Sequence, residues 1–321
     1  MSGAPSRPVR VLMDTDPGID DAAAILLALG SPEIDLVGLA TVAGNAPLAA
    51  TTRNALRVLE LAGAVDVPVA AGAERALVHA MERRTHSVHG DDGLGGALPD
   101  EPTLRQDPRH AIDLLADACR DEPLTVVAIG PLTNLAIALA RYPWLPERID
   151  GLSVMGGARQ EGNVTAAAEF NVWADPEAAA RVLGSGIPVT LLPLDITHQA
   201  VLTATEIDEL AASGRIGAAL ARMVTSYGRR HVGAYGEEFA PLHDVLAVQA
   251  LVAPETITFA DAEVRVDTGW SPSRGATLVR TIHGHGGTPA RVGERLDRDA
   301  FARLLLDRVA GLGQRRPAGP V

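Results

Sequence analysis

Short apolar runs alternate with longer amphipathic stretches along most of the chain. The short runs are rich in β-branched residues and too continuous for a strand with one face in water, which indicates strands buried on both sides. The longer stretches are rich in Ala and Leu and have the length of helices. This alternation is typical of βαβ units. It predicts an α/β fold with a mostly parallel central sheet flanked by helices, Rossmann-like, in a single domain.

The strands and helices of the first two thirds of the chain can be assigned from this pattern. We predict strands at Val9–Asp14, Asp35–Val42, Val67–Ala71, Leu124–Ile129, Gly151–Met155 and Ile187–Leu194. We predict helices at Asp20–Leu29, Pro47–Ala62, Asp107–Arg120, Thr133–Arg141 and Asp175–Leu183. Thr133 and Asp175 are suitable N-caps, and Pro176 suits the first helical position.

Beyond Leu202 the pattern is less regular. We expect two helices, a Gly-rich loop at Tyr227–Gly236, a helix from His243, a β-hairpin around Gly269–Gly275 and a last helix near Leu296–Val309. Both ends are rich in Pro, Gly, Ser and Arg, which predicts disordered arms at residues 1–8 and 313–321 around a domain at residues 9–312. No internal repeat is visible.

Composition and charge narrow the classes of function. The chain has 321 residues, 47% of them hydrophobic, which is enough for a sizeable core. Its 40 acidic and 28 basic residues give a net charge of −12, which argues against a nucleic-acid partner. Every basic residue is Arg, so mechanisms that need a lysine Schiff base or a P-loop lysine are excluded.

The same sequence predicts a cytoplasmic protein without a membrane partner. The first ten residues lack the apolar core of a signal peptide. No apolar run reaches the roughly 20 residues that a membrane span needs. Cys119 is the only cysteine, so the chain cannot form an internal disulfide.

Four carboxylates follow the first predicted strand within eight residues: Asp14, Asp16, Asp20 and Asp21. Helix and turn preferences account for part of this density, because acids are favoured in a first helical turn. Carboxylates this close in a crevice must otherwise shift their pKa values, share protons or hold a cation. Oxygen donors alone suit a hard cation, and a loose set of them suits Ca²⁺ better than Mg²⁺. The segment therefore predicts a calcium site.

An Asp-x-Asp at a strand end is also found in phosphatases of the haloacid dehalogenase type, with Asp14 and Asp16 in the two acidic positions. Those enzymes have Thr or Val two residues after the second Asp, whereas Pro17-Gly18 follows here. This alternative stays open on the residues alone.

A wider set of motifs resembles the inosine-uridine preferring nucleoside hydrolases. The resemblance covers roughly residues 9 to 310 and rests on blocks in the family's order: Asp14 with Asp16-Pro17-Gly18-Ile19-Asp20-Asp21-Ala22, Gly44-Asn45, His89-Gly90 with Gly93-Leu94-Gly95, Gly130-Pro131-Leu132-Thr133-Asn134, Met155-Gly156-Gly157, Glu169-Phe170-Asn171 with Asp175-Pro176-Glu177, and Leu242-His243-Asp244. It implies the nucleoside hydrolase fold. It also implies hydrolysis of the N-glycosidic bond of ribonucleosides to free base and ribose.

The resemblance assigns roles to particular residues. It implies that Ca²⁺ is bound by Asp16, Asp21, Asp244 and the carbonyl of Ile129, and that Asp16 is the general base for a metal-bound water. It implies ribose contacts from Asp20, Asn45, Glu169 and Asn171, with Met155 as an apolar wall. Water attack opposite the departing base predicts inversion at the anomeric carbon.

The side of the site that faces the base is less closely specified. His243 is the candidate acid for the leaving base, and His89 and Phe170 are candidate substrate contacts. The Tyr227–Gly236 segment is a candidate lid, but Tyr227, His231 and Tyr235 cannot be aligned with the family. Trp173 is predicted to be a core residue, and no role is assigned to the remaining histidines: His79, His86, His110, His198, His283 and His285.

Two further expectations remain. A protein that binds Ca²⁺ and ribose without turnover is an alternative to the enzyme, although every expected catalytic position is filled. The resemblance implies a homodimer or a homotetramer.

Overall fold

The computed structural model describes residues 7–79, 89–99, 101–235, 241–281, 284 and 286–314, and no side chain at residues 232–235. Our predictions for His86, Gly236, His283 and His285 lie outside the described residues, as do those for residues 1–6 and 315–321. The side chain of Tyr235 is also outside them.

In the described part of the chain, the strands form one nine-stranded sheet. They are β1 (Val9–Thr15), β2 (Ile34–Thr41), β3 (Val69–Ala71), β4 (Leu124–Ala128), β5 (Ile149–Met155), β6 (Val189–Leu192), β7 (Ile257–Val266), β8 (Thr277–Arg280) and β9 (Thr288–Leu296). Their order is β3-β2-β1-β4-β5-β6-β9-β7-β8. Neighbours from β3 to β9 pair in parallel, and only β7 pairs antiparallel with β9 and β8. The predicted α/β fold, its six strands and the hairpin, which β7 and β8 form, are confirmed.

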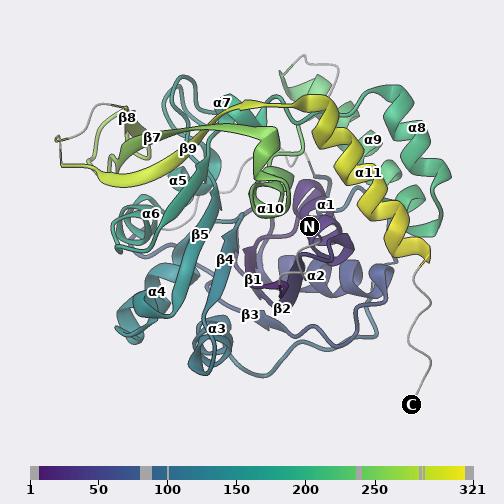
Figure 1. Ribbon diagram of the computed structural model, residues 1–321, viewed down its shortest axis with the longest axis horizontal. Coiled ribbons are helices and arrows are strands. Elements are labelled where there is room, and N and C mark those ends of the chain that lie inside the picture. Colours follow the sequence, from purple (N-terminus) through teal and green to yellow (C-terminus); the bar gives the residue numbers. More distant parts are fainter. Residues whose placement is uncertain are drawn as a thin grey trace, which may run out of the picture.

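Helices cover both faces of this sheet (Figure 1). They are α1 (Ile19–Gly30), α2 (Leu48–Ala62), α3 (Ala111–Arg120), α4 (Thr133–Arg141), α5 (Phe170–Ala174), α6 (Pro176–Leu183), α7 (Leu194–Thr197), α8 (Ala204–Ala212), α9 (Arg215–Tyr235), α10 (Val245–Val252) and α11 (Arg298–Gln314). Two 3₁₀ turns lie at Leu145–Glu147 and Pro254–Thr256. Helices α3, α4 and α6 lie on one side of the sheet in Figure 1, and α1, α2, α10 and α11 on the other. None of the helices described combines the length and hydropathy that a membrane span requires.

The central strand β1 shows why the sheet is buried on both faces. Val11 and Met13 pack into the core on the α1 side, while Leu12 between them packs into the core on the α3 side. All three side chains are fully buried. A strand with two apolar faces is stabilised by a helical layer on each side. Because the strands from β3 to β9 run parallel, their carboxyl ends lie at one edge of the sheet.

The structure corrects three of the predicted elements. Residues 227–235 are not a Gly-rich loop but the last turns of α9. Thr133 does not cap α4; Leu132 is in the N-cap position and the Thr133 hydroxyl donates to Asp175 at 2.7 Å. Helix α3 begins at Ala111 rather than at position 107, with the ring of His110 as its cap. The predicted cap at Asp175 is confirmed, because its side chain accepts from the amide of Ala178.

The α9 correction has a clear physical reason. Gly228 lowers the helix propensity of the segment by about 1 kcal/mol relative to Ala. Ile216, Leu220, Val224 and Tyr227 are buried along one face of the helix. Burial of these side chains outweighs the cost of the glycine, since most helix stability in proteins comes from packing of an apolar face.

Candidate active site

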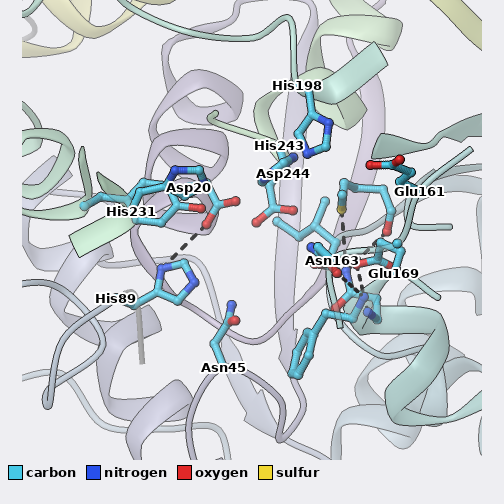
Figure 2. Close-up of a pocket in the computed structure, with 16 residues that line it drawn as sticks. Asp20, Asn45, His89, Glu161, Asn163, Glu169, His198, His231, His243 and Asp244 are labelled. Atoms are coloured by element: carbon cyan, nitrogen blue, oxygen red, sulfur yellow. Dashed lines mark hydrogen bonds and ion pairs between the residues drawn. The ribbon is translucent and has the colours of Figure 1, made fainter. Parts of the chain in front are cut away.

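A pocket opens at the carboxyl edge of the sheet, and its walls come from segments far apart in the sequence. Figure 2 shows the lining side chains converging from these segments. They are Asp20, Asn45, His89, Ile129, Met155, Glu161, Gly162, Asn163, Glu169, Phe170, Asn171, His198, Tyr227, His231, His243 and Asp244. Ten of them were predicted as site residues. Open α/β sheets bind ligands at this edge, so the pocket lies where the fold class predicts it.

The acidic turn between β1 and α1 forms the floor of the site. Gly18 is the N-cap of α1 and has no side chain, so Asp21 reaches back and accepts from the Gly18 amide at 2.8 Å. The Asp21 carboxylate also accepts from the Thr15 hydroxyl at 2.6 Å and from the side-chain amide of Asn45 at 3.2 Å. These bonds hold Asp21, which is fully buried, in one orientation.

Three buried carboxylates meet above this turn. Ligand atoms of Asp20, Asp21 and Asp244 all lie within 4.8 Å of one another. Burial, and then the charge of Asp21, raises the pKa of Asp20 well above its usual range. Burial raises the pKa of Asp244 in the same way, followed by the charges of Asp20, Asp21 and Asp16. Burial also raises the pKa of Asp21, although hydrogen bonds from the Thr15 hydroxyl and the Gly18 amide oppose this.

Asp16 lies next to this cluster and is fully buried. Burial, and then the charge of Asp21, raises its pKa well above the usual range. Its Oδ2 accepts from the Asn45 amide at 2.6 Å, whereas its Oδ1 has no hydrogen-bond donor among the described residues. Asp16 and Asp21 do not line the pocket directly but lie beneath Asn45.

Two glycines make room for the Asp16 carboxylate. A Cβ at Gly44 would lie 2.0 Å from Asp16 Oδ2, and one at Gly130 would lie 2.8 Å from Oδ1. Any side chain at either position would displace the carboxylate. The orphaned Oδ1, the crowded acids and the all-oxygen donor set fit a hard divalent cation, which would relieve their mutual repulsion.

The wall formed by α5 is held together by hydrogen bonds between side chains and backbone groups. Asn171 donates from its side chain to the carbonyl of Ile129 at 3.0 Å and to that of Met155 at 3.3 Å. Glu169 caps α5 and accepts from the amides of Asn171 and Val172 at 2.8 and 3.1 Å. Phe170 is 9% exposed and lines the pocket, while Trp173 is half-buried outside it. The structure thus brings all the predicted residues of this segment to one wall.

Rings form the opposite wall. His89 stacks on Tyr227, with ring centroids 5.0 Å apart and planes 20° apart, and Tyr227 meets His231 edge-on at 5.9 Å. His89 Nδ1 accepts from the amide of Ile19 at 3.1 Å and lies 3.8 Å from Asp20 Oδ1. Tyr227 and His231 reach the pocket from consecutive turns of α9, so this wall belongs to a helix and not to a Gly-rich lid.

His243 lies directly before Asp244, at the start of helix α10. Its Nδ1 lies 2.7 Å from the hydroxyl of Thr197, and its backbone amide hydrogen-bonds to the Asp20 carboxylate. His198 meets it edge-on, with ring centroids 5.4 Å apart. His243 is 8% exposed. The ring is therefore oriented within the site and does not serve as a helix cap, because the residue in the N-cap position of α10 is Asp244.

Asp14 is separate from the pocket lining. It is 1% exposed, and its Oδ1 accepts from the Asn134 side chain at 2.8 Å. Asn134 also donates to the carbonyl of Thr41 and accepts from the amide of Ala73. Asn134 thus connects Asp14 in β1 to the ends of β2 and β3, and Asp14 does not line the pocket.

Sequence reasoning missed several residues that line the pocket. Glu161, Gly162 and Asn163 lie in the loop after β5, and His198 follows α7. No role was assigned to His198, yet it borders His243. Tyr227 and His231 could have been placed from their spacing of four, which continues the spacing of Leu220, Val224 and Tyr227 on one helix face. The Gly-Asn pair at positions 162 and 163 carried no comparable signal.

Comparison with known proteins identifies the family. The sequence profile of the inosine-uridine preferring nucleoside hydrolases matches residues 11–303. The chain belongs to this family. Nucleoside hydrolases of this family depend on a metal ion, and the cluster of Asp20, Asp21 and Asp244 could bind one. The chain is therefore a nucleoside hydrolase, and the phosphatase alternative with Asp14 and Asp16 is wrong.

Individual relatives agree with this assignment to the nucleoside hydrolases. The chain is 40% identical over 305 residues to the pyrimidine-specific ribonucleoside hydrolase RihA of Citrobacter koseri, covering 94% of this chain and 97% of the relative. A plant nucleoside hydrolase structure matches with a TM-score of 0.89 and 36% identity, covering 94% of this chain and 99% of its own. A purine-preferring ribonucleoside hydrolase from Gardnerella vaginalis also matches with a TM-score of 0.89, at 32% identity, covering 95% and 99%. The resemblance seen in the sequence is confirmed.

Proposed function

We propose that this nucleoside hydrolase cleaves ribonucleosides to free base and ribose with Ca²⁺ at the acidic turn. The observation that carries the proposal is the pocket itself, in which buried carboxylates form the floor and histidine and tyrosine rings form a wall. A sugar diol suits the polar floor, and a flat aromatic base suits the rings. The relatives named above include pyrimidine-specific and purine-preferring enzymes, so the proposal extends to ribonucleosides of both base classes.

The proposed ligands of the ion are Asp16, Asp21, Asp244 and the carbonyl of Ile129. Asp20 lies within the same group of carboxylates and is our candidate for a ribose hydroxyl contact. Ca²⁺ is supported by the donor set, which holds only oxygens from several segments and has no sulfur. When bound, the ion supplies positive charge that holds the two ribose hydroxyls and lowers the pKa of the attacking water.

Asp16 is our candidate for the general base. Its Oδ1 is not engaged by any donor among the described residues, so this oxygen is available to accept a proton from water. Asn45 holds the other oxygen at 2.6 Å, so the carboxylate is fixed in direction. The proton leaves the water for Oδ1 as the water oxygen bonds to the anomeric carbon. Attack on the face opposite the base gives inversion.

Positions around the ribose are proposed for Asn45, Glu169 and Asn171, with Met155 as an apolar neighbour. Such contacts stabilise a sugar ring that gains positive charge as the glycosidic bond breaks. Hydrogen bonds of Asn171 to the Ile129 and Met155 carbonyls and of its amide to Glu169 fix its side chain in place. Preorganised polar groups of this kind need little rearrangement during the reaction.

His243 is our candidate for the acid that assists the leaving base. Its Nδ1 is held by Thr197 at 2.7 Å, which orients the ring. His89 and Phe170 are proposed as further contacts of the nucleoside. A departing base carries negative charge on a ring nitrogen, and a proton or hydrogen bond from an imidazole stabilises it. The electron pair of the glycosidic bond leaves with the base, which takes up the proton.

One assay tests these statements together. Release of reducing sugar is measured over uridine, cytidine, inosine, adenosine and guanosine, after chelation and after return of Ca²⁺ or Mg²⁺. We expect turnover that is lost on chelation and restored best by Ca²⁺. Ca²⁺ binding without sugar release from any substrate would favour the non-catalytic binding protein.

Light scattering of the same sample tests the homodimer or homotetramer that we propose from family membership.

A further inference from the structure

The loop that carries His89 is fastened to the acidic turn. A Cβ at Gly18 would lie 2.7 Å from His89 Nδ1, so the imidazole packs directly on the backbone of the turn. The same nitrogen accepts from the Ile19 amide. The loop then turns back at Gly90 and Gly93, whose φ angles of 87° and 82° favour glycine. His89 therefore owes its place to the path of this loop.

Side chains of helix α2 also contact this loop. The side chain of Asn54 is fully buried and donates to the carbonyl of Pro17 at 3.1 Å and to that of Asp92 at 2.9 Å. One amide thus joins the acidic turn to the loop. The fit is close, because a Cβ at Gly93 would lie 2.6 Å from Asn54 Nδ2.

Arg57 lies one turn further along α2 and is 3% exposed. Its guanidinium donates to the carbonyls of Leu98 and Pro99, each at 2.6 Å, to the Asn54 side chain at 3.0 Å, and to Asp92 Oδ2 at 3.2 Å. This one group thus contacts the loop after His89 at two places, at Asp92 and at Leu98 with Pro99. Burial of an arginine is costly unless its donors are satisfied, and the planar fork of five N–H groups meets this need here.

Asp92 supplies the counter-charge. Burial acts to raise its pKa, but hydrogen bonds from the amides of Gly96 and Leu94 and from Arg57 outweigh burial, and the net pKa is below its usual range. Asp92 is thus ionised at neutral pH beside the guanidinium. The two charges and the Asn54 amide form one network, which we name the α2 brace: Asn54, Arg57 and Asp92.

We propose that the α2 brace positions His89 for the reaction, and that Asn54 and Arg57 act on catalysis only through that side chain. None of the three residues lines the pocket. Their contacts go to Asp92, Leu98 and Pro99 in the loop that follows His89, and to Pro17 in the turn on which His89 packs. The proposal rests on the proposed function, in which His89 contacts the nucleoside.

A double-mutant cycle tests it with Arg57→Met, His89→Ala and the double variant, assayed on uridine at saturating Ca²⁺. We expect Arg57→Met to lower kcat/KM about 10- to 100-fold, because a displacement of about 1 Å at a reacting group can cost that much. In the His89→Ala background the same change lowers it less than about threefold. Equal losses in the two backgrounds would overturn the proposal, as would a kcat/KM that Arg57→Met leaves unchanged.

Arg148→Met is the matched control. Arg148 also donates to two backbone carbonyls, those of Cys119 at 3.1 Å and Arg120 at 2.6 Å, but it precedes β5 at the opposite edge of the sheet. We expect Arg148→Met to lower the thermal midpoint, as Arg57→Met does, while its kcat/KM stays within about twofold of that of the unaltered chain. If this control lost activity to the same degree as Arg57→Met, the effect would be one of general stability and the proposal would fail.

Two more measurements keep the outcome decisive. Calorimetric titration should give equal Ca²⁺ affinities for Arg57→Met and the unaltered chain. If Arg57→Met instead lost Ca²⁺ affinity by the same factor as kcat/KM, the brace would act through the acidic turn and the proposal would be wrong. If Arg57→Met does not fold, Asp92→Asn replaces it in the same cycle, since its side chain is 22% exposed and the change keeps its shape. An unaltered chain that releases no sugar refutes the proposed function, whereas equal losses in the cycle refute only the brace.

Discussion

The buried carboxyl of Asp14 predicts a stability that falls as the pH rises. Burial raises its pKa from 3.8 to about 7, and the hydrogen bond from Asn134 only partly opposes this. Between these values the folded chain keeps a proton that the unfolded chain has released. Each unit of pH in that window therefore removes about 1.36 kcal/mol of unfolding free energy, or about 4 kcal/mol over the whole shift. The stabilising proton is fully present below pH 4.

The test is Asp14→Asn in chelator, compared with the unaltered chain from pH 4 to 7.5. Unfolding entropy of about 2.1 cal/mol/K per residue gives about 0.7 kcal/mol/K for this chain, so 4 kcal/mol corresponds to a thermal midpoint change of about 6 °C. Other acids titrate in both proteins, so the difference between their midpoints isolates Asp14. We expect that difference to shift by about 6 °C in favour of the variant as the pH rises. A difference that stays constant with pH would refute the reasoning.

Four further predictions concern the site. Ca²⁺ at a hundredfold excess over its Kd should raise the thermal midpoint by about 4 °C at pH 7.5, and Asp21→Asn should remove this rise in a scanning calorimeter. Asp16→Asn should lower kcat on uridine by about 10²- to 10⁴-fold while the protein stays folded by circular dichroism; near-native turnover would exclude it as the base. His243→Ala should reduce kcat on uridine far more than on p-nitrophenyl riboside, whose leaving group needs little help, and equal losses would count against an acid role. 2′-Deoxyuridine should be cleaved at least about 100-fold less efficiently than uridine in the same assay, because the buried acids lose a hydroxyl partner.

Local chemistry explains what could be read from the chain alone. Strand β1 and the acidic turn were predictable, since a buried apolar run followed by Asp16, Asp20 and Asp21 has few other interpretations. The cap at Asp175 was equally local, because Asp-Pro-Glu favours a helix start through neighbouring groups only. These features depend on residues within one turn or strand of each other, and the sequence determines them without help from distant contacts.

Features that depend on distant partners were decided by the tertiary structure. Thr133 bonds to Asp175 instead of capping its own helix, and His198 reaches the pocket only because α7 follows β6 to the same edge. The helical end of α9 depends on the burial of Tyr227 and its neighbours against the rest of the core, which the glycine content of the segment conceals. The sequence by itself determined the fold class, the acidic turn and the family motifs. Packing between segments decided which rings face the carboxylates, because contact energies across the core exceed the local preferences of single residues.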